Sequence, residues 1–379
     1  MSKYELGPHS SFEATADRVN PAFVETSSPE VHDVATAAHL TSSSPASAPW
    51  PLLPWARGPL SGAVIDALQR EPGTFKPPTH FDVANPLADD DFQMALYLCY
   101  DVNYRDFTVA DWEWDLGLLA FRASLEEIFE SALRLEIGRQ RWQSHVQISD
   151  ALDQLIFASN APSISAYFNV QGTLDQLREL CVHRSASHLQ GTDPHVLAIG
   201  HLSGDARTAL IEIQHDRHTS LGGFRPLASL YGDTMIALGL DASYGSYVEM
   251  LPGVTLATVN LVSMFALHRR WRAALVGQLA VAEMTSVGPM ERYSRALERF
   301  GIGPEGRRFY DVHVDVDAHH AQIARDRMVS GLLSTDARLG PEVLFGAAAM
   351  LLLEQNFAEY LLGSWQQRRS SLVPWEMTA

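Results

Sequence analysis

Helical periodicity dominates the sequence from Asp89 to the C-terminus. Apolar residues recur there every three or four positions, and clear alternation of apolar and polar residues, which is typical of β-strands, is absent. The connections are short, and the sequence has no internal repeat of about 20–50 residues. We therefore predict an all-α fold, with one domain over residues 89–379 in which long helices surround a central bundle. After two helices that precede Gly138, the expected helices are 147–158, 172–190, 203–218, 224–239, 246–268, 271–286, 288–300, 306–332 and 338–368.

The region before Asp89 has a different composition. Residues 1–58 are rich in Ser, Pro and Ala and follow neither the strand period nor the helix period, so we predict that they are mostly disordered. Residues 59–88 contain a short helical pattern, "SGAVIDALQREPG", followed by a Pro-rich linker. We expect this part to pack on the body of the domain.

Charge and apolar content exclude several classes of protein. The 28 Lys and Arg residues are outnumbered by 45 Asp and Glu residues, which gives a net charge of −17 and argues against a nucleic-acid partner. The longest apolar stretch contains Pro252 and Asn260 and is typical of a buried helix rather than a membrane span. Cys99 and Cys181 are far apart and form no disulfide framework. We therefore predict a cytoplasmic protein without a membrane partner.

One short stretch, "VHVDVDAHHAQI", concentrates metal-binding residue types. On a helix, His313, Asp317 and His320 share one face that is flanked by apolar residues, whereas Asp315 and His319 fall on the opposite, solvated side. Two imidazoles and a carboxylate are a ligand set suited to iron, manganese or zinc. The alternative is a buried, hydrogen-bonded His–Asp pair or a partly exposed polar face.

A second candidate ligand is Glu283, the only charged residue from Ala273 to Met290. A lone carboxylate on an apolar helical face is costly unless it is paired, protonated or bound to a metal. If a metal binds here, Glu283 provides the carboxylate ligand that would accompany the histidines. The alternative is an ion pair with an arginine such as Arg269 or Arg270.

A third candidate is the Glu-x-x-His pair of Glu212 and His215, followed by His218. Ferritin-like di-iron bundles project such a pair inward, but the spacing alone is a weak signal. No sequence motif supports another kind of site: the sequence lacks a dinucleotide-binding or P-loop motif, a nucleophile elbow and a C-x-x-C pair.

The pattern H-x-x-x-D-x-x-H resembles the haem-oxygenase-like di-iron oxidases and oxygenases, in particular the bacterial group described as iron-containing redox enzymes. The resemblance runs from about Asp90 to Leu372 and includes "WEWDLGLLAFRASLE", "ALVGQLAVAEMTS" and "LFGAAAMLLLEQNFAEYLLGSW". It implies a haem-oxygenase-like helical bundle in which core helices supply the iron ligands. The residues that match the ligands of the last two of these helices are Glu283, His313, Asp317 and His320.

The sequence departs from the family pattern in the first ligand helix. The matching positions there are Arg217, Phe224 and Leu227, and a further family glutamate is replaced by Gly191. The four retained residues suit a single metal with open positions. Three outcomes stay open: Glu212 with His215 or His218 rebuilds part of the missing half, the site is lost, or an inward-pointing Arg217 replaces the charge of the second metal.

The resemblance implies a non-haem iron oxidase or oxygenase that activates O2. Its substrate would be a small molecule, either an amine or an amino-acid-like or fatty-acid-like compound, in secondary metabolism. One or two iron ions are expected, or none if the incomplete ligand set has lost its function, and an electron donor would be a further partner. The alternative is a catalytically degenerate relative that acts as a partner subunit or ligand-binding protein. We also expect a homodimer or a heterodimer with a homologue.

Overall fold

The structure, a computed structural model, describes residues 53–78, 81–105, 108, 110–138, 147–191, 193–219 and 225–374. These residues belong to one compact unit, Pro49–Ala379. Every regular element in this part of the chain is a helix, which confirms the predicted all-α class. Most of the segment predicted to be disordered, residues 1–52, lies outside the described residues. The predicted boundary at residue 89 stays a prediction.

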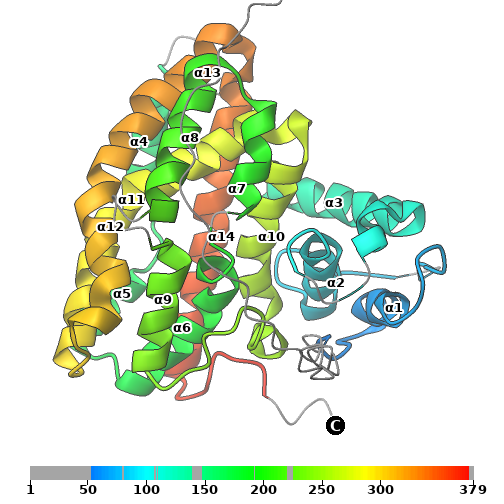
Figure 1. The fold of residues 1–379 in the computed structure, drawn as a ribbon, viewed down its shortest axis with the longest axis horizontal. Coiled ribbons are helices and arrows are strands. Elements are labelled where there is room, and N and C mark those ends of the chain that lie inside the picture. Colours follow the sequence, from blue (N-terminus) through cyan, green and yellow to red (C-terminus); the bar gives the residue numbers. More distant parts are fainter. Residues whose placement is uncertain are drawn as a thin grey trace, which may run out of the picture. The chain divides into compact units, whose positions relative to one another are not determined.

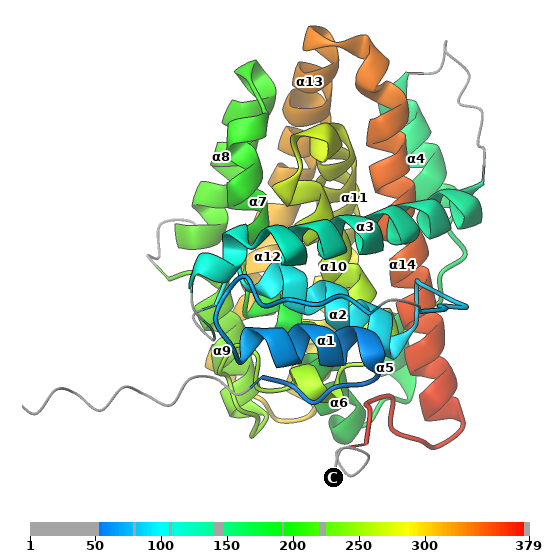
Figure 2. The same cartoon turned by 90° about the vertical axis from the view of Figure 1, so that its right-hand side faces the viewer.

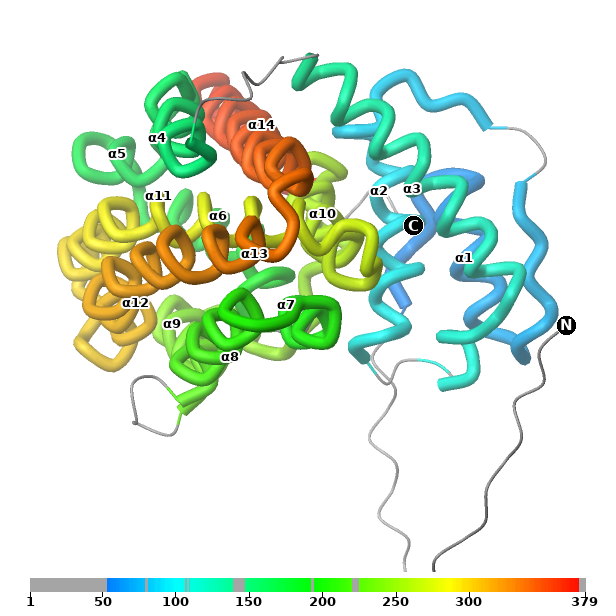
Figure 3. The backbone as a smooth tube through the Cα atoms, turned by 90° about the horizontal axis from the view of Figure 1, so that it is seen from above, coloured from blue at the N-terminus to red at the C-terminus, as the bar shows by residue number. Residues whose placement is uncertain are grey.

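The central helix of the bundle is α11 (Arg272–Arg299). It packs extensively against both α12 (Pro304–Gln322) and α14 (Gly340–Gln366), as Figure 3 shows from above. α10 (Gly253–Leu267) lies against α14 and connects the bundle to α2 (Asp90–Asp101). The helices around this centre are α4 (Ile148–Ala158), α5 (Ile164–Val170), α6 (Leu174–His188), α7 (Asp193–Ala198), α8 (Gly204–Thr219), α9 (Leu227–Ala237) and α13 (Ser330–Thr335).

On one side of the bundle, α2 is accompanied by α1 (Pro59–Leu68) and α3 (Leu116–Ile137) (Figures 1 and 2). Both helices pack on α2, and α3 also reaches α14. α1 is the short helix expected in residues 59–88, and its contacts are with α2. None of the helices in the described parts of the chain combines the length and apolar character needed to cross a bilayer.

Two glycines allow α11 and α14 to approach each other closely. A Cβ atom added to Gly277 of α11 would collide with the backbone carbonyl of Val343, and one added to Gly346 of α14 would collide with the carbonyl of Ala274. The two helices therefore meet backbone to backbone at this crossing. The contact lies less than two turns before Glu283 and fixes the position of α11 relative to α14.

The long α11 differs from the predicted pair of helices 271–286 and 288–300. Pro289 lies inside one continuous helix, although a proline removes a backbone donor and favours a break. Ala296 and Leu297, about two turns further on, are buried in the core. The packing of this last part of the helix outweighs the local preference of the proline.

The predicted helix 306–332 is also divided differently. α12 ends at Gln322 and continues into a π-helix, Ile323–Val329, before α13 begins at Ser330. π-helical turns are rare and frequently lie at functional sites. Here the π-helix starts three residues after His320 and packs against α8 and α11.

The N-terminus of α1 is capped by a residue of another helix. The preceding residue, Gly58, has no side chain, and the carboxylate of Asp91 instead accepts hydrogen bonds from the Leu60 amide at 2.9 Å and the Ser61 amide at 2.7 Å. The Ser61 hydroxyl donates to the same carboxylate. The first turn of α1 is thus tied to α2 rather than capped locally.

We expect Asp91→Ala to lower the free energy of unfolding by about 1–3 kcal/mol, because it leaves these partly buried donors without an acceptor. Thermal unfolding measures the loss, and faster hydrogen exchange of the α1 amides would locate it. Asp66→Ala is the matched control, since Asp66 is exposed on α1. Equal effects of the two substitutions would contradict this account of the cap.

Candidate metal centre

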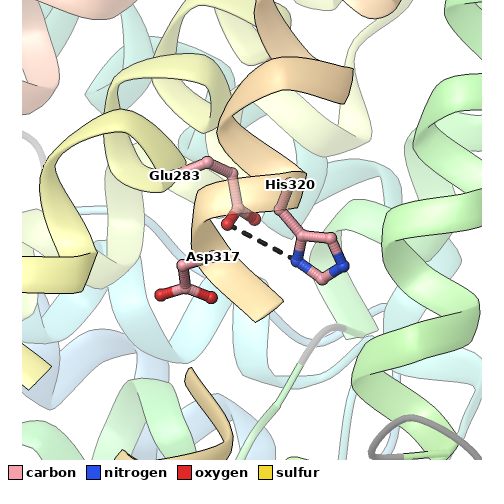
Figure 4. Close-up of side chains that lie close together, drawn as sticks. All are labelled: Glu283, Asp317 and His320. Atoms are coloured by element: carbon pink, nitrogen blue, oxygen red, sulfur yellow. Dashed lines mark ion pairs between the residues drawn. The ribbon is translucent and has the colours of Figure 1, made fainter. Parts of the chain in front are cut away.

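Three side chains from two neighbouring helices converge in the core. Glu283 comes from α11, and Asp317 and His320 come from α12; each is at most 2 % exposed. Figure 4 shows the three side chains close together. One ligand atom of each lies within 4.8 Å of those of the other two. Among the described residues, no other group of three His, Cys, Asp or Glu side chains is arranged in this way.

The predicted helical phase of α12 is confirmed. His313, Asp317 and His320 are buried, whereas Asp315 and His319 are exposed. Because an α-helix advances about 100° per residue, neighbours of the same chemical type fall on opposite sides. The exposed pair provides matched controls for the buried one.

The cluster leaves polar atoms without partners. Glu283 Oε2, Asp317 Oδ2 and His320 Nδ1 are buried, and none of them has a hydrogen-bond partner. His320 Nδ1 lies 3.7 Å from Glu283 Oε2, which is too long for a hydrogen bond. Unpaired buried polar atoms are costly, and a cation placed among them would satisfy all three. The residues present therefore fit a metal ion.

The orientation of His320 is set from α8. Its Nε2 lies 3.2 Å from Asp216 Oδ2, and because a carboxylate accepts, Nε2 carries the proton and Nδ1 keeps its lone pair toward Glu283. A carboxylate behind a histidine in this way is the usual support of a metal-binding imidazole. Burial alone would lower the pKa of His320, but the negative charge of Glu283 and the hydrogen bond to Asp216 raise it.

His313 lies beside the cluster and faces a cavity. Its Nδ1 donates to the carbonyl oxygen of Phe309 at 2.8 Å, which leaves the lone pair on Nε2. Burial lowers the pKa of His313 and so favours the neutral ring. This tautomer is the one that a metal ligand requires, although His313 is not among the three side chains that already converge.

The second oxygen of Glu283 has a partner from α8. Arg217 Nη2 donates to Glu283 Oε1 at 2.5 Å. Burial by itself would raise the pKa of Glu283, but the charge of Arg217 and the contacts with His320 lower it to about 2. An arginine therefore does pair with Glu283, but it is Arg217 and not Arg269 or Arg270.

The structure does not bring Glu212 and His215 to this cluster. Glu212 forms an ion pair with Arg327 at 2.5 Å, and the side chain of His215 is 68 % exposed beside Asp216. The buried face of α8 is defined by Ala206, Leu210 and Ile213, and Arg217 follows in the same phase. Glu212 and His215 fall beside this face, so a rebuilt half-site around them is not observed.

The remaining departures from the family pattern are placed as follows. Leu227 is buried in the apolar core that α9 shares with α12. Gly191 has a φ of +68°, in the left-handed region that favours glycine over other residues. Phe224 lies outside the described residues.

A cavity of about 530 Å³ adjoins the cluster. Glu283, His313, Asp317 and Arg217 line one part of it. Another part of its wall is the ion pair of Arg184 and Glu354, whose two hydrogen bonds measure 2.8 and 2.5 Å. The other lining residues include Leu180, His188, His195, Val259, Val262, Gln278, Leu279, Met290, Tyr293 and Tyr310.

Sequence reasoning missed Asp216, Arg184 and Glu354. Glu354 could have been found by the criterion that identified Glu283, because it is the only charged residue in the apolar run of α14 after Glu342 and before Glu359. Asp216 gave no such signal, since it lies in the charged end of α8.

Residues 178–355 match the model of a family described as iron-containing redox enzyme. The chain belongs to the haem-oxygenase-like superfamily. The predicted family and fold are thereby confirmed. The matched residues include α8, α11 and α12, and the family description supports a general iron-dependent redox role. No match was found among curated proteins.

Proposed function

We propose that the protein is a non-haem iron-dependent oxidase or oxygenase that activates O2 and acts on a small molecule in the cavity. The observation that carries the proposal is the convergence of three unpartnered buried ligand atoms, from Glu283, Asp317 and His320, at the edge of that cavity. His313 would complete the ligand set. The chain lacks any competing cofactor-binding motif.

Each residue of the centre has a distinct role in this proposal. Glu283, Asp317, His320 and His313 would hold the iron, Asp216 orients His320, and Arg217 keeps Glu283 ionised. Bound iron would supply the redox chemistry with O2. The surrounding apolar side chains limit the access of water, which protects a reactive centre from side reactions.

The cavity limits the size and chemistry of the substrate. About 530 Å³ lies in the range of small-molecule sites, and the lining combines apolar side chains with charged and polar ones. The Arg184–Glu354 pair offers both a donor and an acceptor to a polar end of the substrate. An amine, an amino-acid-like or a fatty-acid-like compound would meet these conditions, and a role in secondary metabolism and an electron donor are part of the same proposal.

Anaerobic loading with Fe(II), followed by elemental analysis, tests the proposal. We expect stoichiometric iron in the wild-type protein and less in His313→Ala, together with O2 consumption when air is admitted to the loaded protein. A folded wild-type protein that retains no iron after this treatment would refute the proposal.

A second candidate function is that of a catalytically degenerate partner subunit or ligand-binding protein, in a homodimer or with a homologue. The salt bridge from Arg217 to Glu283 favours it, because it satisfies one oxygen of the carboxylate without a metal. Under this alternative, a double substitution of His313 and His320 by alanine leaves the biological output unchanged. A strong loss of output would count against it.

A further inference from the structure

We propose that Arg217 takes the place of a second cation at Glu283 and thereby limits the centre to one divalent metal ion. The inference rests on the proposed function, since it concerns the same metal. In this proposal, α8 restricts the number of bound ions through Arg217, whereas α11 and α12 supply the ligands.

The two oxygens of Glu283 have different environments. Oε2 faces His320 Nδ1 at 3.7 Å and has no hydrogen-bond partner, whereas Oε1 accepts from Arg217 Nη2 at 2.5 Å. A carboxylate that bridges two metals in the common way binds one metal with each oxygen. Arg217 occupies Oε1, which blocks this mode of bridging and leaves Oε2, on the side of His320, for an ion.

Two other carboxylates of α8, those of Asp216 and Glu212, already have partners. Asp216 accepts from His320 Nε2, and Glu212 pairs with Arg327. Asp216 therefore contacts the ligand His320, and its neighbour Arg217 contacts the ligand Glu283. Within the described residues no second group of ligand side chains adjoins the first.

The charges at the site also favour a single divalent ion. Glu283 and Asp317, when ionised, balance one divalent ion, and the neutral histidines add nothing. The carboxylate of Asp216, which lies against His320, balances Arg217, so the centre is neutral when it holds one divalent ion. A second divalent ion beside Arg217 would add two more charges in a buried, weakly screened place, where repulsion is strongest.

Metal stoichiometry tests this inference without any measurement of activity. Wild-type protein is titrated anaerobically with Mn(II), and the bound ions are counted by elemental analysis while electron paramagnetic resonance distinguishes isolated from spin-coupled ions. We expect one isolated ion per chain. Arg217→Glu replaces the cation by a carboxylate, and we expect it to raise the count to two.

Arg207→Glu is the matched control, because Arg207 lies on the same helix but donates to the carbonyl of Leu202. We expect it to keep the count at one. Two ions in the wild type would overturn the inference and leave the proposed function standing, whereas no ion in the wild type would overturn both. One ion in a folded Arg217→Glu variant, judged by its circular dichroism and Tm, would show that Arg217 does not limit the count. If that variant does not fold, Arg217→Gln, which removes the positive charge but keeps a similar size, replaces it: we expect a second ion at high Mn(II), and a count that stays at one would overturn the inference.

Discussion

His320→Ala is expected to weaken Fe(II) binding by about 100-fold or more, because it removes a ligand atom and leaves the carboxylates of Glu283 and Asp317 without their nitrogen partner. Nδ1 of His320 already faces Glu283 and needs no rearrangement to bind an ion. Affinity is measured by anaerobic titration with Fe(II), or with Co(II), whose visible absorption reports the coordinating atoms.

His319→Ala is the control for this experiment. His319 is the next residue of α12 and is exposed, so its removal should leave the affinity unchanged. Asp317→Asn and Asp315→Asn form a second pair. The substitution at the buried Asp317 should weaken metal binding, and the one at the exposed Asp315 should not. Equal affinities within either pair would mean that the metal, if it binds, binds elsewhere.

Gly277→Val is expected to destabilise the fold by about 3 kcal/mol or more, since the added side chain collides with the backbone of α14 and not with a movable side chain. The α11–α14 crossing would have to widen, and that would displace Glu283 as well. Denaturant unfolding measures the loss of stability. A fall in metal affinity in the same variant would report the displacement of α11.

Gly363→Ala provides the contrasting change on α14. No atom lies within 4 Å of the position that its Cβ would take, so alanine should stabilise the helix by about 0.5–1 kcal/mol. We therefore expect the free energy of unfolding to fall in Gly277→Val and to rise in Gly363→Ala. A Gly277→Val protein as stable as the wild type would contradict the close approach of the two helices.

The fold class and the buried set of α12 could be predicted from sequence because both follow from periodicity. A helix with a known phase separates His320 from His319, and an isolated charge in an apolar run identifies Glu283. These signals are local, so they do not depend on knowing which helices are neighbours.

The contribution of α8 could not be predicted in this way. Glu212 and His215 have the spacing of a ligand pair, but the apolar residues on either side of them turn α8 so that Arg217 faces Glu283. Which face of a short, charged helix is buried depends on the helices against which it packs. The residues of the cavity, Arg184 and Glu354 among them, come from helices far apart in sequence and share no local pattern.

The π-helix after His320 has a consequence for how this protein can be compared with its relatives and altered by design. Each π-helical turn contains an extra residue relative to an α-helix, so the chain beyond Val329 is rotated by about 100° from the phase that α12 would dictate. A deletion of one residue within Ile323–Val329 could be absorbed by conversion to an α-helix, with the ligands upstream left in register. This segment is accordingly the place where the length of the chain can vary while the metal centre stays intact.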